Sequence, residues 1–146
     1  MTHATAWTIA LVLAAGGLAA TSVTAAEVAL SAHLMGMAEK PAAGDPDGMG
    51  HATLKVDAAK SQVCYSLMVE GIAPSTMAHI HKGAADAAGP VAVPLTMPDA
   101  AGKSAGCATV DATVVADMLA NPAGYYVNVH NAEYPTGALR GQLSGH

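Results

Sequence analysis

Two histidines separated by one residue, His79 and His81, are the feature of this sequence best suited to chemistry. They lie in the segment 78–83, which is typical of a β-strand that ends in a glycine-containing loop. Because residues two apart in a strand project to the same face, the two imidazoles would form half of a transition-metal site. His130, at the end of the strand-like segment 125–130, could supply a third ligand. The alternative is that these histidines form only a solvated polar face.

Other polar residues could complete or support this site. Glu39 or Asn128 could add an oxygen ligand, or a hydrogen bond that orients an imidazole. Arg140 could form an ion pair with Glu39 or bind an anion, and the sequence leaves these two roles open. Three neutral imidazoles suit both Cu(II) and Zn(II), so copper is the predicted metal and zinc is its alternative.

A second candidate group combines thioethers with imidazoles, a set of ligands that suits Cu(I). Its members lie between positions 33 and 51: His33, Met35, Met37, Met49 and His51. The alternative is that these methionines fill gaps in the core, a common use of this flexible side chain. The sequence leaves open whether this group joins the site of His79, His81 and His130.

The first 26 residues are typical of a secretory signal peptide. An apolar run extends from Trp7 to Ala20, and the small residues at 23–26 resemble a cleavage region, which places the mature N-terminus near Glu27. The run is too short and too rich in alanine and glycine for a good transmembrane helix, although an uncleaved anchor is the alternative. We therefore expect a periplasmic or secreted protein with one domain, residues 27–146, and no membrane segment after cleavage.

The two cysteines fit an exported chain. Cys64 and Cys107 predict one disulfide, because an even number of cysteines in an exported protein is typically paired. The alternative is a pair of thiolate metal ligands, which the absence of a Cys-x-x-Cys motif disfavours.

The charge of the chain argues against nucleic-acid binding. The formal net charge is −5, and the six lysines and arginines are scattered rather than clustered. A mildly acidic protein without a basic patch is a poor partner for nucleic acid. The partners that we expect are a metal ion and, as an alternative, another exported protein.

Alternating apolar and polar residues predict several short strands separated by turn residues. A pattern of this kind is typical of an antiparallel β-sandwich of Greek-key or immunoglobulin-like type. A helix is expected at 112–120, with Asp111 as its N-cap. The first strand could continue to Glu39, which would place His33, Met35, Met37 and Glu39 on one side. The expected strands are 27–33, 50–57, 61–70, 77–81, 91–95, 103–110, 125–130 and 138–143.

Three segments of the chain resemble the CHRD domain family, a module named after chordin and also found alone in exported bacterial proteins. The first contains Leu34, Gly36, Glu39 and Pro41, although the family usually has valine where this chain has Lys40. The second is Ala-His-Ile-His-Lys-Gly-Ala-Ala at 78–85 with Gly-Pro-Val-Ala-Val-Pro-Leu at 89–95. The third covers 121–130 and 134–143, and includes Asn-Val-His and Leu-Arg-Gly-Gln-Leu.

The resemblance implies an exported β-sandwich module, and the histidines of the family fall on His79, His81 and His130. It implies no established reaction, so function has to be argued from the site. The interpretation that we favour is a non-catalytic metal-binding protein, with copper serving in sequestration, delivery or tolerance.

Two alternatives belong to other classes. The first is an extracellular interaction module with structural histidines, which the connection to chordin motivates. The second is an enzyme similar to copper-zinc superoxide dismutase, a family that also has a His-x-His motif, a disulfide and a functional arginine. The sequence departs from that family because the loop 83–89 offers only Asp86 as a ligand where a zinc-binding loop would stand. We therefore leave catalysis uncertain, with a non-catalytic role preferred.

Overall fold

The computed structural model describes residues 26–145. The expected signal peptide, residues 1–26, therefore lies outside the described residues except for Ala26. The described chain forms nine strands, one α-helix and two short 3-10 helices. The elements, in chain order, are β1 (Val28–Met35), η1 (Gly36–Ala38), β2 (Met49–Asp57), β3 (Gln62–Glu70), β4 (Ser75–Lys82), β5 (Val91–Leu95), β6 (Lys103–Thr109), α1 (Ala112–Ala120), η2 (Pro122–Gly124), β7 (Tyr125–Asn131), β8 (Leu139–Gln142) and β9 (Ser144–Gly145).

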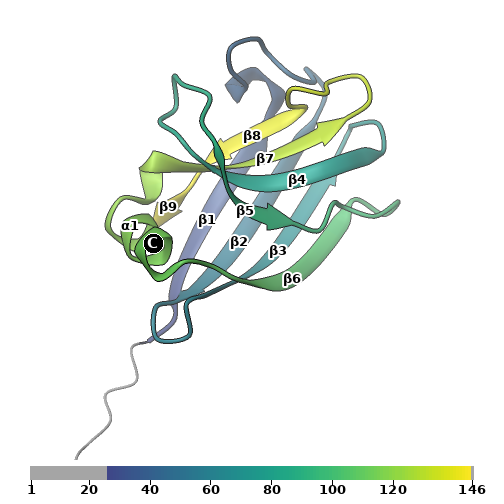
Figure 1. Ribbon diagram of the computed structural model, residues 1–146. Coiled ribbons are helices and arrows are strands. Elements are labelled where there is room, and N and C mark those ends of the chain that lie inside the picture. Colours follow the sequence, from purple (N-terminus) through teal and green to yellow (C-terminus); the bar gives the residue numbers. More distant parts are fainter. Residues whose placement is uncertain (1–25, 146) are drawn as a thin grey trace, which may run out of the picture.

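All nine strands belong to one antiparallel sheet. Its order is β5-β4-β7-β8-β1-β2-β3-β6, and β9 pairs separately with β1. The sheet curls until its two edge strands, β5 and β6, lie close together without pairing, so that two layers face each other and form a nearly closed barrel (Figure 1). The expected all-β antiparallel fold with one short helix is confirmed, and its two layers are halves of one continuous sheet.

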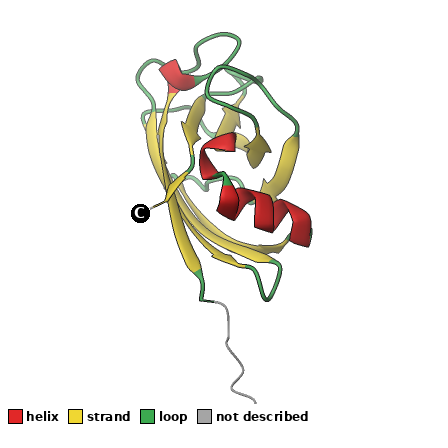
Figure 2. Ribbon diagram, turned by 90° about the vertical axis from the view of Figure 1, so that its left-hand side faces the viewer, coloured by secondary structure: helices red, strands yellow, loops and turns green. Residues whose placement is uncertain are grey.

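The alternation of apolar residues explains the core. In β2 and β3 every second residue points inward, as Leu54, Val56 and Leu67 do, and these side chains are buried. The helix α1 lies beside one end of the strands (Figure 2), and its Val115 and Met118 join the same core. The predicted helix boundaries are confirmed, and the Asp111 carboxylate accepts a hydrogen bond of 2.7 Å from the Thr113 backbone N–H.

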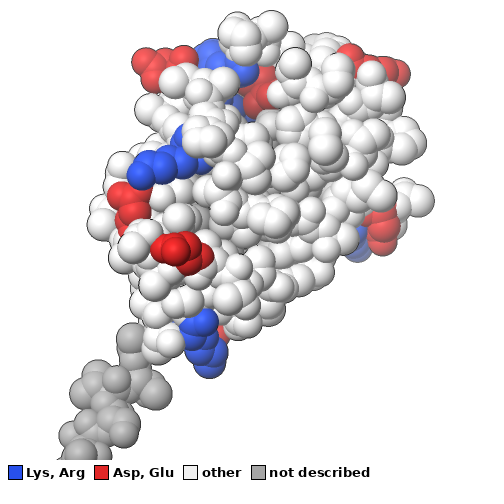
Figure 3. Space-filling model, in the orientation of Figure 1, with Lys and Arg blue, Asp and Glu red and all other residues white. Residues whose placement is uncertain are grey.

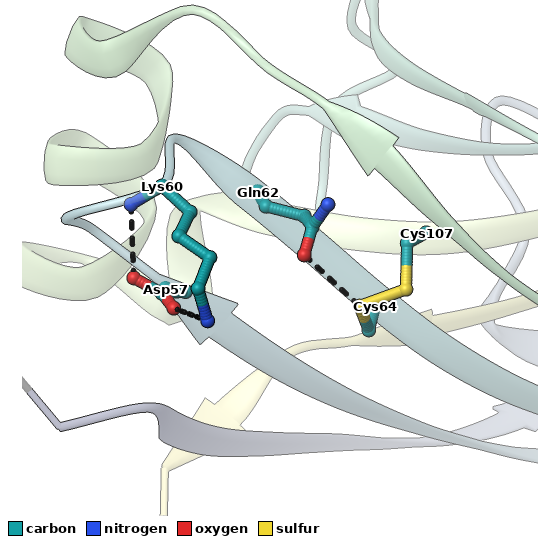
Figure 4. The surroundings of a disulfide bond; sticks show 5 residues. All are labelled: Asp57, Lys60, Gln62, Cys64 and Cys107. Carbon is teal, nitrogen blue, oxygen red and sulfur yellow. Dashed lines mark hydrogen bonds and ion pairs between the residues drawn. A yellow bond between two sulfur atoms is a disulfide. The ribbon is translucent and has the colours of Figure 1, made fainter.

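The predicted disulfide is present between the adjacent strands β3 and β6. Cys64 lies directly opposite Cys107, with an S–S distance of 2.02 Å (Figure 4). The alternative of two thiolate ligands is therefore wrong, since both sulfur atoms are used. Close by, the turn from β2 to β3 is closed by Lys60, whose ammonium lies 2.7 Å from the Asp57 carboxylate.

The first strand ends earlier than the sequence allowed. β1 stops at Met35, and the chain turns through η1, where the backbone N–H groups of Glu39 and Gly44 both donate to the Gly36 carbonyl. The expectation that Glu39 shares a strand face with His33 and Met37 is therefore wrong. Glu39 is buried, whereas Met37 is exposed.

Charged groups are sparse on the surface of the described chain. On the face shown in Figure 3 both signs are present and dispersed, and most of the surface is uncharged. None of the described helices is both long and apolar enough to span a membrane.

Candidate metal centre

Strand pairing brings the three candidate histidines together on the outer face of the sheet. β4 carries His79 and His81, and β7 carries His130. His79 lies opposite Asn128 and Met77 lies opposite His130, so all of these side chains leave the same face. One ligand atom from each histidine lies within 4.8 Å of the others. The structure therefore brings the three predicted ligands together in one cluster, called the histidine cluster below.

Two backbone carbonyls fix which ring nitrogens are free. The Nδ1 atom of His81 lies 2.9 Å from the Gly89 carbonyl oxygen, and that of His130 lies 3.1 Å from the Pro135 carbonyl oxygen. A carbonyl can only accept, so each Nδ1 must carry the proton and each neutral ring has its lone pair on Nε2. The Nε2 atom of His81 is buried and has no hydrogen-bond partner among the described residues. A buried atom of this kind indicates a missing partner.

The spacing of the nitrogens fits a metal ion. His79 Nδ1 lies 3.3 Å from His130 Nε2, to which it donates a hydrogen bond when the lone pair of His130 is on Nε2, and a metal ion would replace that proton. Two nitrogens bound at about 2.0 Å to one tetrahedral ion are about 3.3 Å apart. His79 and His130 thus stand at ligand spacing, and a ring nitrogen of His81 lies within 4.8 Å of theirs. Three ligands would leave one position open.

Burial favours the neutral form of His79 and of His130. It lowers the pKa of His79, and the neighbouring His130 and His81 lower it further. Burial also lowers the pKa of His130, against the hydrogen bond to Pro135, which raises it. Neutral imidazoles do not have to lose a proton before they bind a metal ion.

The ring of His81 is stacked on the ring of Tyr126, which in turn contacts Arg140. The two rings lie parallel, with centroids 4.9 Å apart and planes inclined by 6°. The Arg140 guanidinium lies 3.5 Å from the centroid of the same tyrosine. Since β7 lies between β4 and β8, Tyr126 stands between the imidazole and the guanidinium.

Arg140 also holds the loop that fixes His81. Its Nη2 donates to the Ala84 and Ala87 carbonyls at 2.6 and 3.0 Å, and the side chain is only 1% exposed. Gly89, at the end of this loop, donates its N–H to the Tyr126 hydroxyl and accepts from His81. Arg140 forms no ion pair with Glu39 among the described residues. Its contacts make it a positioning residue for the loop.

Asn128 lies opposite His79, and Glu39 lies beside Asn128, but neither forms a hydrogen bond with the three imidazoles. The Asn128 amide donates to the Leu139 carbonyl at 2.9 Å. Burial raises the pKa of the Glu39 carboxyl, against smaller lowering effects of Asn128 and Arg140. A side chain at Gly137 would collide with the Glu39 carboxylate, which explains the glycine there.

The methionine–histidine group forms a separate surface, called the methionine groove below. Direct pairing between β1 and β2 places His33 opposite His51 and Met35 opposite Met49. A groove of about 970 Å³ contains all five predicted members, including Met37, and also Met68 of β3. The two regions lie on strands β4 and β1, which are three strand spacings, or about 14 Å, apart in the sheet. One row of directly paired residues crosses this distance: His79, Asn128, Arg140 and Met35. The groove therefore does not join the histidine cluster.

Sequence reasoning missed several parts of both regions. Met77 lies opposite His130, and Met68 lies opposite His51, but only the strand register reveals these pairs. The outward position of Met68 between Leu67 and Val69 could have signalled its place. The carbonyls of Gly89 and Pro135 had no signal in the sequence, because every residue has a carbonyl. The stacking of Tyr126 on His81 had none either, because it depends on the pairing of β4 with β7.

The fold and the cluster define an all-β domain with a candidate three-histidine metal centre. The model of the CHRD domain family matches residues 30–143, and the chain belongs to this family. No curated protein and no solved structure matches the chain.

Proposed function

We propose that this protein is an exported, non-catalytic copper-binding protein whose ligands are His79, His81 and His130. The observation that carries the proposal is the convergence of three ring nitrogens, two of which are left unprotonated because the opposite ring nitrogen donates to a backbone carbonyl. Such outer hydrogen bonds orient metal-binding imidazoles in many proteins. The role would be sequestration, delivery or tolerance of copper.

Copper is favoured over zinc by the general order of affinities. A site built from imidazole nitrogens binds Cu(II) more tightly than the other divalent first-row ions, including Zn(II). Zinc is the alternative, since three imidazoles also make a normal zinc site.

Export is supported by two independent features. Residues 1–26 have the pattern of a signal peptide, and the Cys64–Cys107 disulfide fits an oxidising compartment. Expression of the full chain in a bacterium, followed by N-terminal sequencing of the periplasmic or secreted protein, should give Ala26 or Glu27 as the first residue. Recovery of intact Met1 only from the membrane fraction would instead support an uncleaved anchor.

Two other functions remain as alternatives. An interaction module would use the surface and keep its histidines as structural groups. A copper enzyme would need an accessible anion-binding arginine, whereas Arg140 is buried and engaged by the loop carbonyls. We therefore prefer binding without catalysis.

The test is metal titration of the tag-free protein, expressed as the full chain. We expect one tightly bound Cu(II) per protein, and its loss in the double variant His79→Ala/His81→Ala. The matched control is His33→Ala/His51→Ala, which removes another close pair of histidines, with ring centroids 4.9 Å apart, and should retain the ion. Absence of tight Cu(II) and Zn(II) in the unaltered protein would refute the proposal and favour an interaction module.

A further inference from the structure

We propose that the methionine groove is a second metal site, specific for Cu(I) and similar soft monovalent ions, with Met35 and Met49 as its principal ligands. Its imidazole ligand comes from His33 or His51. The site goes beyond the copper function proposed for the histidine cluster, and neither site needs the other to be correct.

Strand register places the four donor side chains on one small patch. His33–His51 and Met35–Met49 are neighbouring pairs on the same face of β1 and β2. Partners across a strand pair are about 5 Å apart, and residues two apart along a strand are about 7 Å apart. Flexible thioether side chains at this spacing can converge on one ion without any change in the backbone.

The exposure of these methionines argues against a packing role. Met35 is 46% exposed and Met49 is 52% exposed, whereas Met118 is fully buried in the core. Of the seven methionines in the described residues, Met118 alone has the buried position of a gap-filler. Thioethers left at the surface are available as ligands.

The surroundings add a further thioether and a negative charge. Met68 lies opposite His51 on the far side of β2, and it also lines the groove. Glu70 lies opposite Met49, and Asp47 and Lys103 also line the groove, with Lys103 opposite Met68, so two carboxylates stand against one ammonium. A nearby carboxylate favours a bound cation through direct electrostatic attraction.

The donor set selects the oxidation state. Thioether sulfur is a soft ligand that prefers Cu(I), while imidazole accepts both oxidation states of copper. The histidine cluster contains only imidazoles, and the methionine groove contains at least two thioethers. The protein would therefore hold Cu(II) and Cu(I) at two places on one sheet.

The test uses Cu(I) under anaerobic conditions, in competition with a chromophoric Cu(I) chelator, and Ag(I) as a second probe that cannot be oxidised. In the His79→Ala/His81→Ala variant we expect one Cu(I) or Ag(I) per protein to remain. Adding Met35→Leu/Met49→Leu should remove that ion, and adding Met97→Leu, an exposed methionine outside the groove, should not.

Each other outcome has a definite meaning. If the histidine variant binds neither Cu(I) nor Ag(I), or if binding survives loss of both methionines, the groove is not a soft-metal site. If the histidine variant does not fold, Met35→Leu/Met49→Leu in the unaltered background must still remove one Cu(I) equivalent, or the proposal is wrong. If the unaltered protein binds no Cu(II), only the copper function proposed for the histidine cluster is refuted.

Discussion

The histidine cluster and the methionine groove lie on the same outer face of one sheet, but they are built differently. The histidine cluster is half-buried, and carbonyls, a stacked tyrosine and a buried arginine hold its rings. The methionine groove is exposed and its donors are placed only by the register of β1 and β2. Outward-facing residues of a strand can thus become either a rigid site or a flexible one.

The loops that follow the strands determine whether such a site is rigid or flexible. The loop after β4 folds back over His81, and the loop after β7 brings the Pro135 carbonyl to His130. No comparable hydrogen bond reaches His33 or His51 among the described residues. The histidine cluster should therefore depend on remote supporting residues, whereas the groove should depend only on its own side chains.

The largest effect should come from oxidation of the metal-free protein with peroxide. Conversion of Met35 and Met49 to sulfoxides replaces soft sulfur donors by oxygen and should abolish Cu(I) binding in the groove. Cu(II) binding at the histidine cluster should persist. Peptide mass spectrometry would measure the oxidation, and the buried Met118 serves as an internal control that stays reduced. Full oxidation of both residues without loss of Cu(I) from the groove would contradict the comparison.

The next effect concerns Arg140→Leu, a change that adds no thioether opposite Met35. The substitution leaves the Ala84 and Ala87 carbonyls and the Gln142 side chain without their donor, at a cost of roughly 3 kcal/mol in the free energy of unfolding. Urea denaturation would measure this loss. Cu(II) affinity should fall and Cu(I) binding in the groove should not. Lys60→Leu, which removes an exposed ammonium from its ion pair with Asp57, is the control and should lower the free energy of unfolding less than the change at Arg140 does, because water still reaches the lysine.

A smaller effect is expected for Gly89→Ala. A Cβ atom at Gly89 would overlap the Lys82 carbonyl oxygen, so the loop has to move and the Gly89 carbonyl leaves His81. Loss of such a supporting hydrogen bond typically weakens metal affinity about 10- to 100-fold. Competition titration with Cu(II) would measure it. Gly145→Ala, where the nearest atom to a Cβ is 3.9 Å away, should behave like the unaltered protein. Equal affinities in all three proteins would show that the carbonyl does not support His81.

The smallest effect concerns Glu39, which lies beside the row between the two regions. Burial raises the pKa of its carboxyl above the ordinary 4.5, so the folded state keeps a proton that the unfolded state has already lost. The free energy of unfolding should therefore fall as pH rises from 4.5 through the folded pKa. Glu39→Gln should remove this contribution, as measured by urea denaturation over that pH range. Identical curves for Glu39→Gln and the unaltered protein would contradict the prediction.

Much of the fold could be predicted from the sequence, because it depends on local patterns. The alternation in 51–57 and 63–69 predicts strands with one buried face, and Asp111 marks the start of the helix. The turn at η1 could not be predicted, since it depends on contacts of Gly36 with the distant Gly44 and Asp45. The apolar pattern of β1 alone gives no reason for the chain to turn there.

For the two sites, the sequence predicted the candidate ligand residues better than the residues that hold those ligands in place. His79 and His81 share a face because they are two apart in a strand, and this needs no tertiary knowledge. The separation of the methionine groove from the histidine cluster depends on β8 lying between β7 and β1, which strand order alone determines. The role of Arg140 depends on a loop more than 50 residues away in the chain, so no local pattern indicates it.

The stacking of Tyr126 against His81 has an optical consequence. Trp7 is the single tryptophan of the chain, and it lies within residues 1–26, so a chain processed as proposed would emit only from its four tyrosines. Tyr126 is the one whose ring is parallel to a candidate metal ligand, at a centroid distance of 4.9 Å. A paramagnetic ion bound to His81 would quench this emission, so the molecule carries its own fluorescent reporter of occupancy.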